Sequence, residues 1–181
     1  MKKYSSFFLS FALLFTFVSC KSKTAPTKSP EQVVENALVA LRENDQTMIT
    51  ECFGMNILDP EVLPPSFSNI YMAAFQKLEY NIISSSTDGN TATITAELTV
   101  VNLEAIAEAY LTEMENETGQ ETSQNLGEAV QGYIQLIQRE DAEMYIATVS
   151  FMLEKVDGVW LIAYDEHMAN VLFGFPSNVS A

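Results

Sequence analysis

The sequence predicts an α+β fold in which a curved antiparallel sheet of about four strands packs on N-terminal helices. Three observations lead to this prediction. Apolar residues recur with helical spacing up to Leu78, and the spacing then changes to alternation along the chain. Two Asp-Gly pairs, at 88–89 and 157–158, mark hairpin turns. A second helical stretch, residues 103–139, separates the two predicted hairpins, so we expect an αα insertion between strands two and three.

The first predicted helix begins at a capping motif. Ser29 is the expected N-cap, Pro30 suits the first helical position, and Gln32 completes a capping box. The residues that follow place one apolar stripe along the helix, and Asn44 is the expected end. The stripe consists of Val33, Val34, Ala37, Leu38 and Leu41.

Two further helices are expected before the sheet. Asp45 is placed to cap a short second helix, and Gly54 is placed to end it. Residues 55–66 contain three of the six prolines and are typical of an irregular loop. Ser66 begins a third predicted helix, whose apolar residues keep helical spacing as far as Leu78.

Residues 78–87 and 91–101 form the first predicted hairpin, with its turn at Asp88-Gly89-Asn90. The second strand alternates between apolar and polar residues, which predicts one buried face and one wetter face. Its apolar face consists of Ala92, Ile94, Ala96, Leu98 and Val100.

The third predicted strand, residues 144–156, carries apolar residues on both faces, which favours a central position in the sheet. Its partner, residues 159–164, follows the turn at 157–158. Asp165 is placed to cap a final short helix that ends before Gly174.

The stretch 103–139 contains two apolar stripes with the same helical spacing, joined by an acidic polar link. This pattern is typical of a helical hairpin, and its stripes can either cover the sheet or bind a partner. The first stripe is Leu103, Ile106, Ala107, Tyr110, Leu111 and Met114; the second is Leu126, Ala129, Val130, Tyr133, Ile134 and Ile137.

The N-terminus has the organisation of an export signal. Lys2 and Lys3 precede an uncharged apolar run, residues 4–18, which is too short as a helix to span a bilayer of about 30 Å. The run ends at Ser19-Cys20, which resembles the lipobox of bacterial lipoproteins. This resemblance implies a thiol at Cys20 that carries a lipid anchor.

The sequence therefore divides into three parts. Residues 1–19 are a predicted lipoprotein signal peptide, residues 20–29 are a lipidated cysteine with a flexible tether, and residues 30–181 are a single α+β domain. Two acyl chains on Cys20 would give stable anchoring. We expect an extracytoplasmic protein held at the bacterial cell membrane through this lipid.

Charge excludes one class of partner. From Ser29 onward, four lysines and arginines stand against all 24 acidic residues of the chain, a formal charge of −20. Such a surface repels phosphate backbones, so the sequence predicts no binding to nucleic acid. A cationic ligand or partner would be favoured.

Two segments carry a resemblance to a fold family. One is SPEQVVENALVALRENDQTMITECF (29–53), and the other is FMLEKVDGVWLIAYDEHMANVLFG (151–174). Their order of helices, strands and turns resembles the nuclear transport factor 2-like fold, and in particular the uncharacterised small lipoproteins of Gram-positive bacteria that contain it. The resemblance implies a cone-shaped domain with a cavity, whose mouth would lie near Trp160 and Tyr164.

Residues that could support chemistry are few. The single His167 and the isolated Cys52 give no metal-binding pattern, and no cofactor is expected. Cys52 falls on an apolar helical stripe, which favours a buried structural thiol. Only Tyr164, Asp165 and His167 resemble an acid–base cluster, and Asp165 serves equally well as a helix cap.

Three functions remain open from the sequence. The leading hypothesis is a membrane-tethered, non-catalytic domain that binds a small molecule or acts as an adaptor. The second is a protein-interaction module that acts through the hairpin 103–139. The third is an acid–base enzyme with its site in the cone. An interaction module should show a spare apolar helix face, whereas a binder or an enzyme should show an enclosed pocket.

Overall fold

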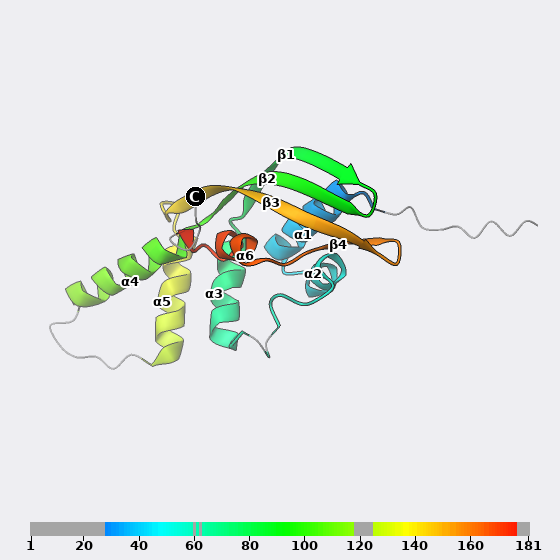
Figure 1. Ribbon diagram of the computed structural model, residues 1–181. Helices are drawn as coiled ribbons and strands as arrows, with labels where there is room; N and C mark the ends of the chain where they lie inside the picture. Colours follow the sequence, from blue (N-terminus) through cyan, green and yellow to red (C-terminus); the bar gives the residue numbers. More distant parts are fainter. Residues whose placement is uncertain (1–27, 60, 62, 118–124, 177–181) are drawn as a thin grey trace, which may run out of the picture.

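The computed structural model describes residues 28–59, 61, 63–117 and 125–176. Along these residues three helices precede a hairpin, two helices precede a second hairpin, and a short helix follows, which confirms the predicted α+β fold class (Figure 1). The elements are α1 (Pro30–Glu43), α2 (Gln46–Phe53), α3 (Pro65–Phe75), β1 (Glu79–Asp88), β2 (Thr91–Val101), α4 (Leu103–Glu117), α5 (Leu126–Gln138), β3 (Met144–Val156), β4 (Val159–Ile162) and α6 (Glu166–Leu172).

The sheet has the strand order β1-β2-β3-β4, and each pair of neighbours is antiparallel. Two-residue turns join the strands within each hairpin, and Gly89, Asp157 and Gly158 adopt the positive φ angles that such turns require. The sheet curves over α1 and α2 (Figure 1). The αα insertion lies between β2 and β3, where the sequence predicts it.

The predicted caps of the N-terminal helices are confirmed. The side chain of Ser29 accepts a hydrogen bond from the backbone N–H of Gln32 at 3.2 Å, and Gln32 Oε1 accepts one from the Ser29 N–H at 3.0 Å. Asn44 ends α1 in the left-handed conformation. Asp45 caps α2 through the Met48 N–H at 3.0 Å, and Gly54 ends this helix.

Two predicted boundaries need correction, and the burial of β3 adds a detail that its sequence does not show. Helix α3 begins at Pro65 and ends at Phe75, because the chain must turn before β1 starts at Glu79. Strand β4 ends at Ile162 rather than at Tyr164, because Asp165 already caps α6. Strand β3 is interior to the sheet, as predicted, but only one of its faces is buried. Ile146 and Met152 on the other face are 62% and 48% exposed.

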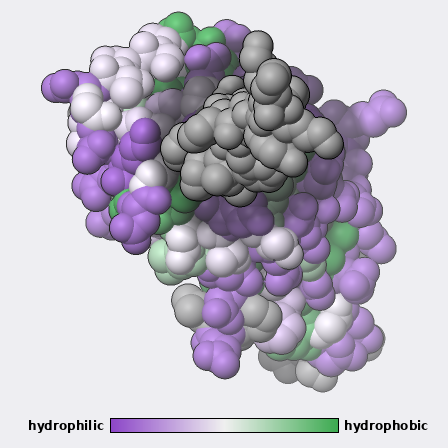
Figure 2. Space-filling model, turned by 90° about the vertical axis from the view of Figure 1, so that its right-hand side faces the viewer, coloured by the Kyte–Doolittle hydropathy of each residue, from purple (hydrophilic) through white to green (hydrophobic). Residues whose placement is uncertain are grey.

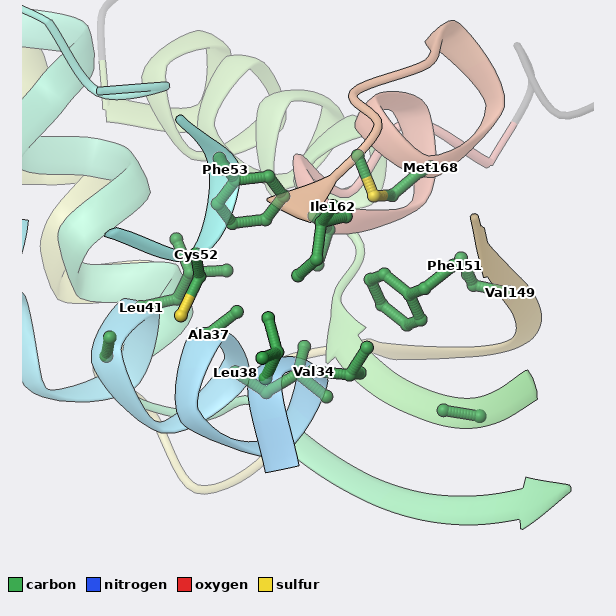
Figure 3. Close-up of a cluster of buried hydrophobic side chains, with 14 of the residues drawn as sticks. Val34, Ala37, Leu38, Leu41, Cys52, Phe53, Val149, Phe151, Ile162 and Met168 are labelled. Carbon is green, nitrogen blue, oxygen red and sulfur yellow. The ribbon is translucent and has the colours of Figure 1, made fainter. Parts of the chain in front are cut away.

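The main core lies between the concave face of the sheet and helices α1, α2 and α6. The alternating apolar residues of β2, from Ala92 to Val100, are all buried there, as their alternation predicts. Figure 3 shows side chains from α1, β3 and β4 converging on one another, with Phe151 near the centre and Met168 of α6 closing one side. Burial of this surface is the main favourable contribution to folding.

A smaller second core lies where α3, α4 and α5 meet the end of β2. Its buried residues are Ala73, Ala74, Val101, Leu103, Ile106, Leu136 and Ile137. Helix α5 packs along α3, and the two stand side by side below the sheet (Figure 1). The hairpin stripes therefore pack mainly on α3 and on each other, and only partly on the sheet.

The two ends of the molecule differ in surface character. Both hairpin turns lie on the right of Figure 1, and this end faces the viewer in Figure 2. Hydrophilic residues dominate it, and hydrophobic residues show only as small separate areas outside the grey atoms (Figure 2). Helices α4 and α5 project from the opposite end, and the candidate site lies among them.

Candidate functional site

An apolar groove with a volume of about 320 Å³ lies between α3, α4, α5 and the residues after α6. We call it the helical groove. It is open to solvent, and its lining contains no lysine, arginine, aspartate, glutamate or histidine. Its volume is at the lower end of the range for sites that bind small molecules or anchor side chains. It is lined by Ser66, Phe67, Ile70, Tyr71, Leu103, Ala107, Leu126, Ala129, Val130, Tyr133 and Phe175.

Helix α3 forms one wall of the groove. Its C-terminal residues Ala73, Ala74 and Phe75 are buried in the cores, but its N-terminal half extends beyond them. Phe67 is consequently 51% exposed. Tyr71 is held in place because its ring packs edge-on against Phe173 with centroids 4.7 Å apart. This wall therefore combines the fixed ring of Tyr71 with the accessible ring of Phe67.

Helix α5 forms the opposite wall; it is capped at its start and anchored in the second core at its end. Asn125 accepts a hydrogen bond from the Glu128 N–H at 3.0 Å, which starts the helix with a capping box. Leu136 and Ile137 bury its last turn in the second core. The first turn projects into solvent, so that Leu126 is 71% exposed.

The floor of the groove is set where α4 begins. The Leu103 N–H donates to the Gly174 carbonyl at 3.0 Å, which joins the start of α4 to the residues after α6. Asn102 accepts a hydrogen bond from the Ala105 N–H at 3.2 Å and so caps α4. Leu103 and Phe175 are thereby positioned side by side in the lining.

The tyrosines of the groove are uncharged groups at neutral pH. Burial raises the pKa of Tyr71. Burial also raises the pKa of Tyr133, and the neighbouring Tyr110 raises it further. The rings of Tyr110 and Tyr133 lie 4.6 Å apart and link α4 to α5. Two hydroxyl groups are thus available for hydrogen bonds beside a lining that is otherwise apolar.

The surroundings of the groove are acidic. Helix α4 carries Glu104, Glu108, Glu113 and Glu115 but neither lysine nor arginine. Helix α3 has no charged residue, and α5 has only Glu128. Arg139 follows α5, and its guanidinium pairs with both carboxylate oxygens of Glu113 at 2.6 and 3.1 Å, a bidentate contact.

Trp160 and Tyr164, predicted at the mouth of a cone, are not among the residues that line the helical groove, although Tyr164 lies near Tyr71. Trp160 is buried at the end of the sheet, with the Lys155 ammonium 5.4 Å from its ring centroid. Tyr164 is 42% exposed. Burial raises the pKa of Tyr164, and the nearby Tyr71 and Asp165 raise it further. Their role in binding stays a prediction.

One residue of the predicted acid–base cluster, Asp165, has a structural role. The Asp165 carboxylate accepts a hydrogen bond from the Met168 N–H at 2.8 Å and caps α6. His167 lies exposed in the first turn of that helix. Within the described residues, no group of three or more His, Cys, Asp or Glu side chains could hold a metal ion.

Cys52 is buried against α1, as its apolar stripe predicts (Figure 3). Burial raises the pKa of its thiol, which nearby Lys28 partly counteracts. Cys20 and the predicted signal peptide lie outside the described residues. Among the helices that the structure describes, none combines the length and the hydropathy needed to cross a bilayer.

The helical groove was only partly predictable. The sequence shows both stripes of the hairpin 103–139, and it proposes them as a surface for a partner. It gives no indication that Phe67 and Ile70 of α3 belong to the same surface. The signal for them is that both belong to the apolar helical spacing of the third predicted helix.

Comparisons with known proteins give little further information. No family model matches the sequence, and no curated protein matches it. The crystal structure of a candidate lipoprotein, YcdA from Bacillus subtilis subsp. subtilis str. 168, is similar to this chain with a TM-score of 0.46 and 12% sequence identity. The match covers 81% of this chain and 46% of that one, so this chain spans less than half of the length of the Bacillus protein.

Proposed function

We propose that this protein is a lipid-anchored, extracytoplasmic adaptor whose domain binds an apolar part of a partner in the helical groove. The observation that carries the proposal is the groove itself, because three helices leave an apolar surface open between them. Phe67 and Leu126 would bury much of their exposed area on binding. The nuclear transport factor 2-like assignment belongs to the same proposal and is supported by the order of helices and hairpins.

The open shape of the groove favours an adaptor over an enzyme. An enzyme that uses acid–base chemistry needs titratable groups at the reacting atoms and a site that excludes water. The lining of the groove holds tyrosines but no carboxylate or imidazole, and it is open along one side. A contiguous apolar surface that is accessible instead marks a site of interaction, as in grooves that bind a helix of a partner.

The adaptor role is tested by photo-crosslinking in intact cells. With p-benzoylphenylalanine in place of Leu126, we expect a discrete crosslinked product, because this position is 71% exposed at the edge of the groove. Adding Ala107→Trp should abolish the product, since an indole at this lining position fills the groove. The measurement is a mobility shift on a denaturing gel.

Two matched controls accompany this experiment. The crosslinker in place of Ile146, which is 62% exposed on the outer face of the sheet, should give no discrete product. Thr112→Trp adds the same indole to an exposed position of α4 outside the lining and should leave the product at position 126 intact. Equal crosslinking from positions 126 and 146 would contradict a specific site in the groove.

The anchor has its own test. Cells supplied with an alkyne-tagged fatty acid should label the wild-type protein, and Cys20→Ala should remove the label and release the protein into the soluble fraction. The reason is that a diacylglyceryl group in thioether linkage to Cys20 carries two acyl chains, which give stable membrane binding that the tether alone cannot provide. Cys52→Ala is the control and should keep the label. Label or membrane association that persists in Cys20→Ala would contradict lipidation.

A further inference from the structure

The groove's acidic border restricts the chemistry of its partner. Leu103 and Ala107 of α4 line the groove, and helical spacing places the 60% exposed Leu111 next along the same face. Each of the first two is followed by a glutamate, Glu104 and Glu108, which therefore lie in the adjacent row of side chains. An apolar row and an acidic row thus run side by side along α4.

Acidic residues outnumber basic ones at this border. The residues of α3, α4 and α5 include neither lysine nor arginine. Beyond the helices, Lys77 lies near the end of α5, where its ammonium donates to the Arg139 carbonyl. Arg139, beyond the end of α5, is held by both oxygens of Glu113. Since residues from Ser29 onward carry a formal charge of −20, the long-range field has the same sign as the local one.

This charge argues against two kinds of occupant. A second copy of the chain would bring its own acidic α4 against the first one, and like charges placed together in an interface are costly. A fatty acid or an anionic lipid would place its negative head group at the same border. A partner with positive charge, in contrast, gains attraction on approach and after binding.

The dimensions of the groove fit a helix. From Leu103 to Leu111 the axis of α4 rises by about 12 Å, and from Leu126 to Tyr133 the axis of α5 rises by about 10 Å. The apolar faces of α4 and α5 beside the groove are thus each about two helical turns long. Amphipathic helices bind in such grooves between helices through anchors at positions i, i+4 and i+7.

We propose that the helical groove binds a cationic amphipathic helix of a partner protein, with apolar residues in the groove and lysine or arginine facing Glu108 and Glu115. The inference rests on the adaptor function proposed above and names the chemistry of the partner. Specificity comes from the border, while the lining supplies most of the contact area.

The test measures binding of model peptides to the full lipidated chain in phosphatidylcholine nanodiscs, with empty nanodiscs as the blank. A fluorescent peptide of about 15 residues carries leucine on one helical face and lysine beside it. Its counterpart has glutamate in place of every lysine. Fluorescence polarisation should show saturable binding of the lysine peptide, and binding of the glutamate peptide at least about tenfold weaker.

Variants of the chain then locate the interaction. Glu108→Gln with Glu115→Gln should weaken binding of the lysine peptide roughly two- to tenfold, because each exposed ion pair contributes modestly. The same charge change on the outer sheet face, Glu97→Gln with Glu154→Gln, should have little effect, since both residues are exposed away from the groove. Ala107→Trp should abolish binding.

The outcomes separate this inference from the adaptor function. If both peptides bind equally, or if the α4 and outer-face variants behave alike, the proposal of a cationic partner is wrong. The proposal that the groove is a binding site is then unaffected. If neither peptide binds but position 126 still crosslinks in cells, the partner is of another kind. If the crosslink and the peptide binding are both absent, the inference and the adaptor function fall together.

Discussion

Phe151→Ala should lower the free energy of unfolding by about 3–5 kcal/mol, the range for removing a buried aromatic ring. Phe151 is fully buried on interior strand β3, opposite Ile94 of β2. Its ring lies where the sheet faces α1 and α6, so the cavity would be surrounded by rigid elements that cannot close it (Figure 3). In urea, the unfolding midpoint should fall by at least about 1 M.

The neighbouring residue provides the control. Met152 occupies the next position of β3 but faces outward and is 48% exposed. Met152→Ala removes side-chain atoms from the same strand without opening the core, so we expect a change in unfolding free energy within about 1 kcal/mol. Similar losses for the two variants would contradict the assignment of the inner and outer faces.

The fold was predictable because its signals are local. The capping box at Ser29 and the Asp-Gly pair at 157–158 each specify a helix start or a turn within a few residues. The alternation along β2 identifies its buried face without knowledge of what covers it. These features determine the elements and their order, from which the antiparallel topology follows.

Burial on the outer face of the sheet was not predictable. Apolar residues on both faces of β3 predict its central position correctly, yet Ile146 and Met152 on the outer face are exposed. An apolar residue on a strand shows only that an apolar side chain is accepted at that position. It does not show burial, because folded proteins have many apolar atoms on their surfaces. Only the arrangement of neighbouring elements decides which face is covered.

The complete lining of the helical groove could not be predicted for a related reason. Its lining combines residues near Phe67, Leu103, Ala129 and Phe175, which are far apart in the sequence. Helical periodicity indicates that each helix has an apolar face, but it does not show how much of that face a neighbour covers. In α5, Ile137 is fully buried and Leu126 is 71% exposed, although both belong to one stripe.

Gly174→Ala should lower the free energy of unfolding by about 2–5 kcal/mol. Gly174 has a φ of 72°, where any residue with a Cβ is strained by about 1–2 kcal/mol. A Cβ there would also press on the Val101 carbonyl oxygen and lie 3.2 Å from the Leu103 nitrogen. These are backbone atoms at the junction of β2 and α4, so relief requires the chain to move at a further cost of about 1–3 kcal/mol.

Gly89→Ala separates the conformational strain at positive φ from the contact of the Cβ with neighbouring backbone atoms. Gly89 has a similar φ of 58°, but a Cβ at this position would meet no atom within 4 Å. It should therefore cost only the conformational strain, and the difference between the two variants in urea unfolding measures the contact with Val101. Equal losses would contradict the close approach at Gly174.

Gly174→Ala should also alter the helical groove. Gly174 accepts the hydrogen bond from Leu103 and is followed by Phe175, and both of these neighbours line the groove. A shift of this junction would change the floor of the groove, whereas Gly89→Ala changes only a distant hairpin turn. We expect crosslinking from position 126 to fall in Gly174→Ala relative to the amount of folded protein, and to persist in Gly89→Ala. Such a result would show that the junction of β2, α4 and the residues after α6 positions the binding surface as well as stabilising the fold.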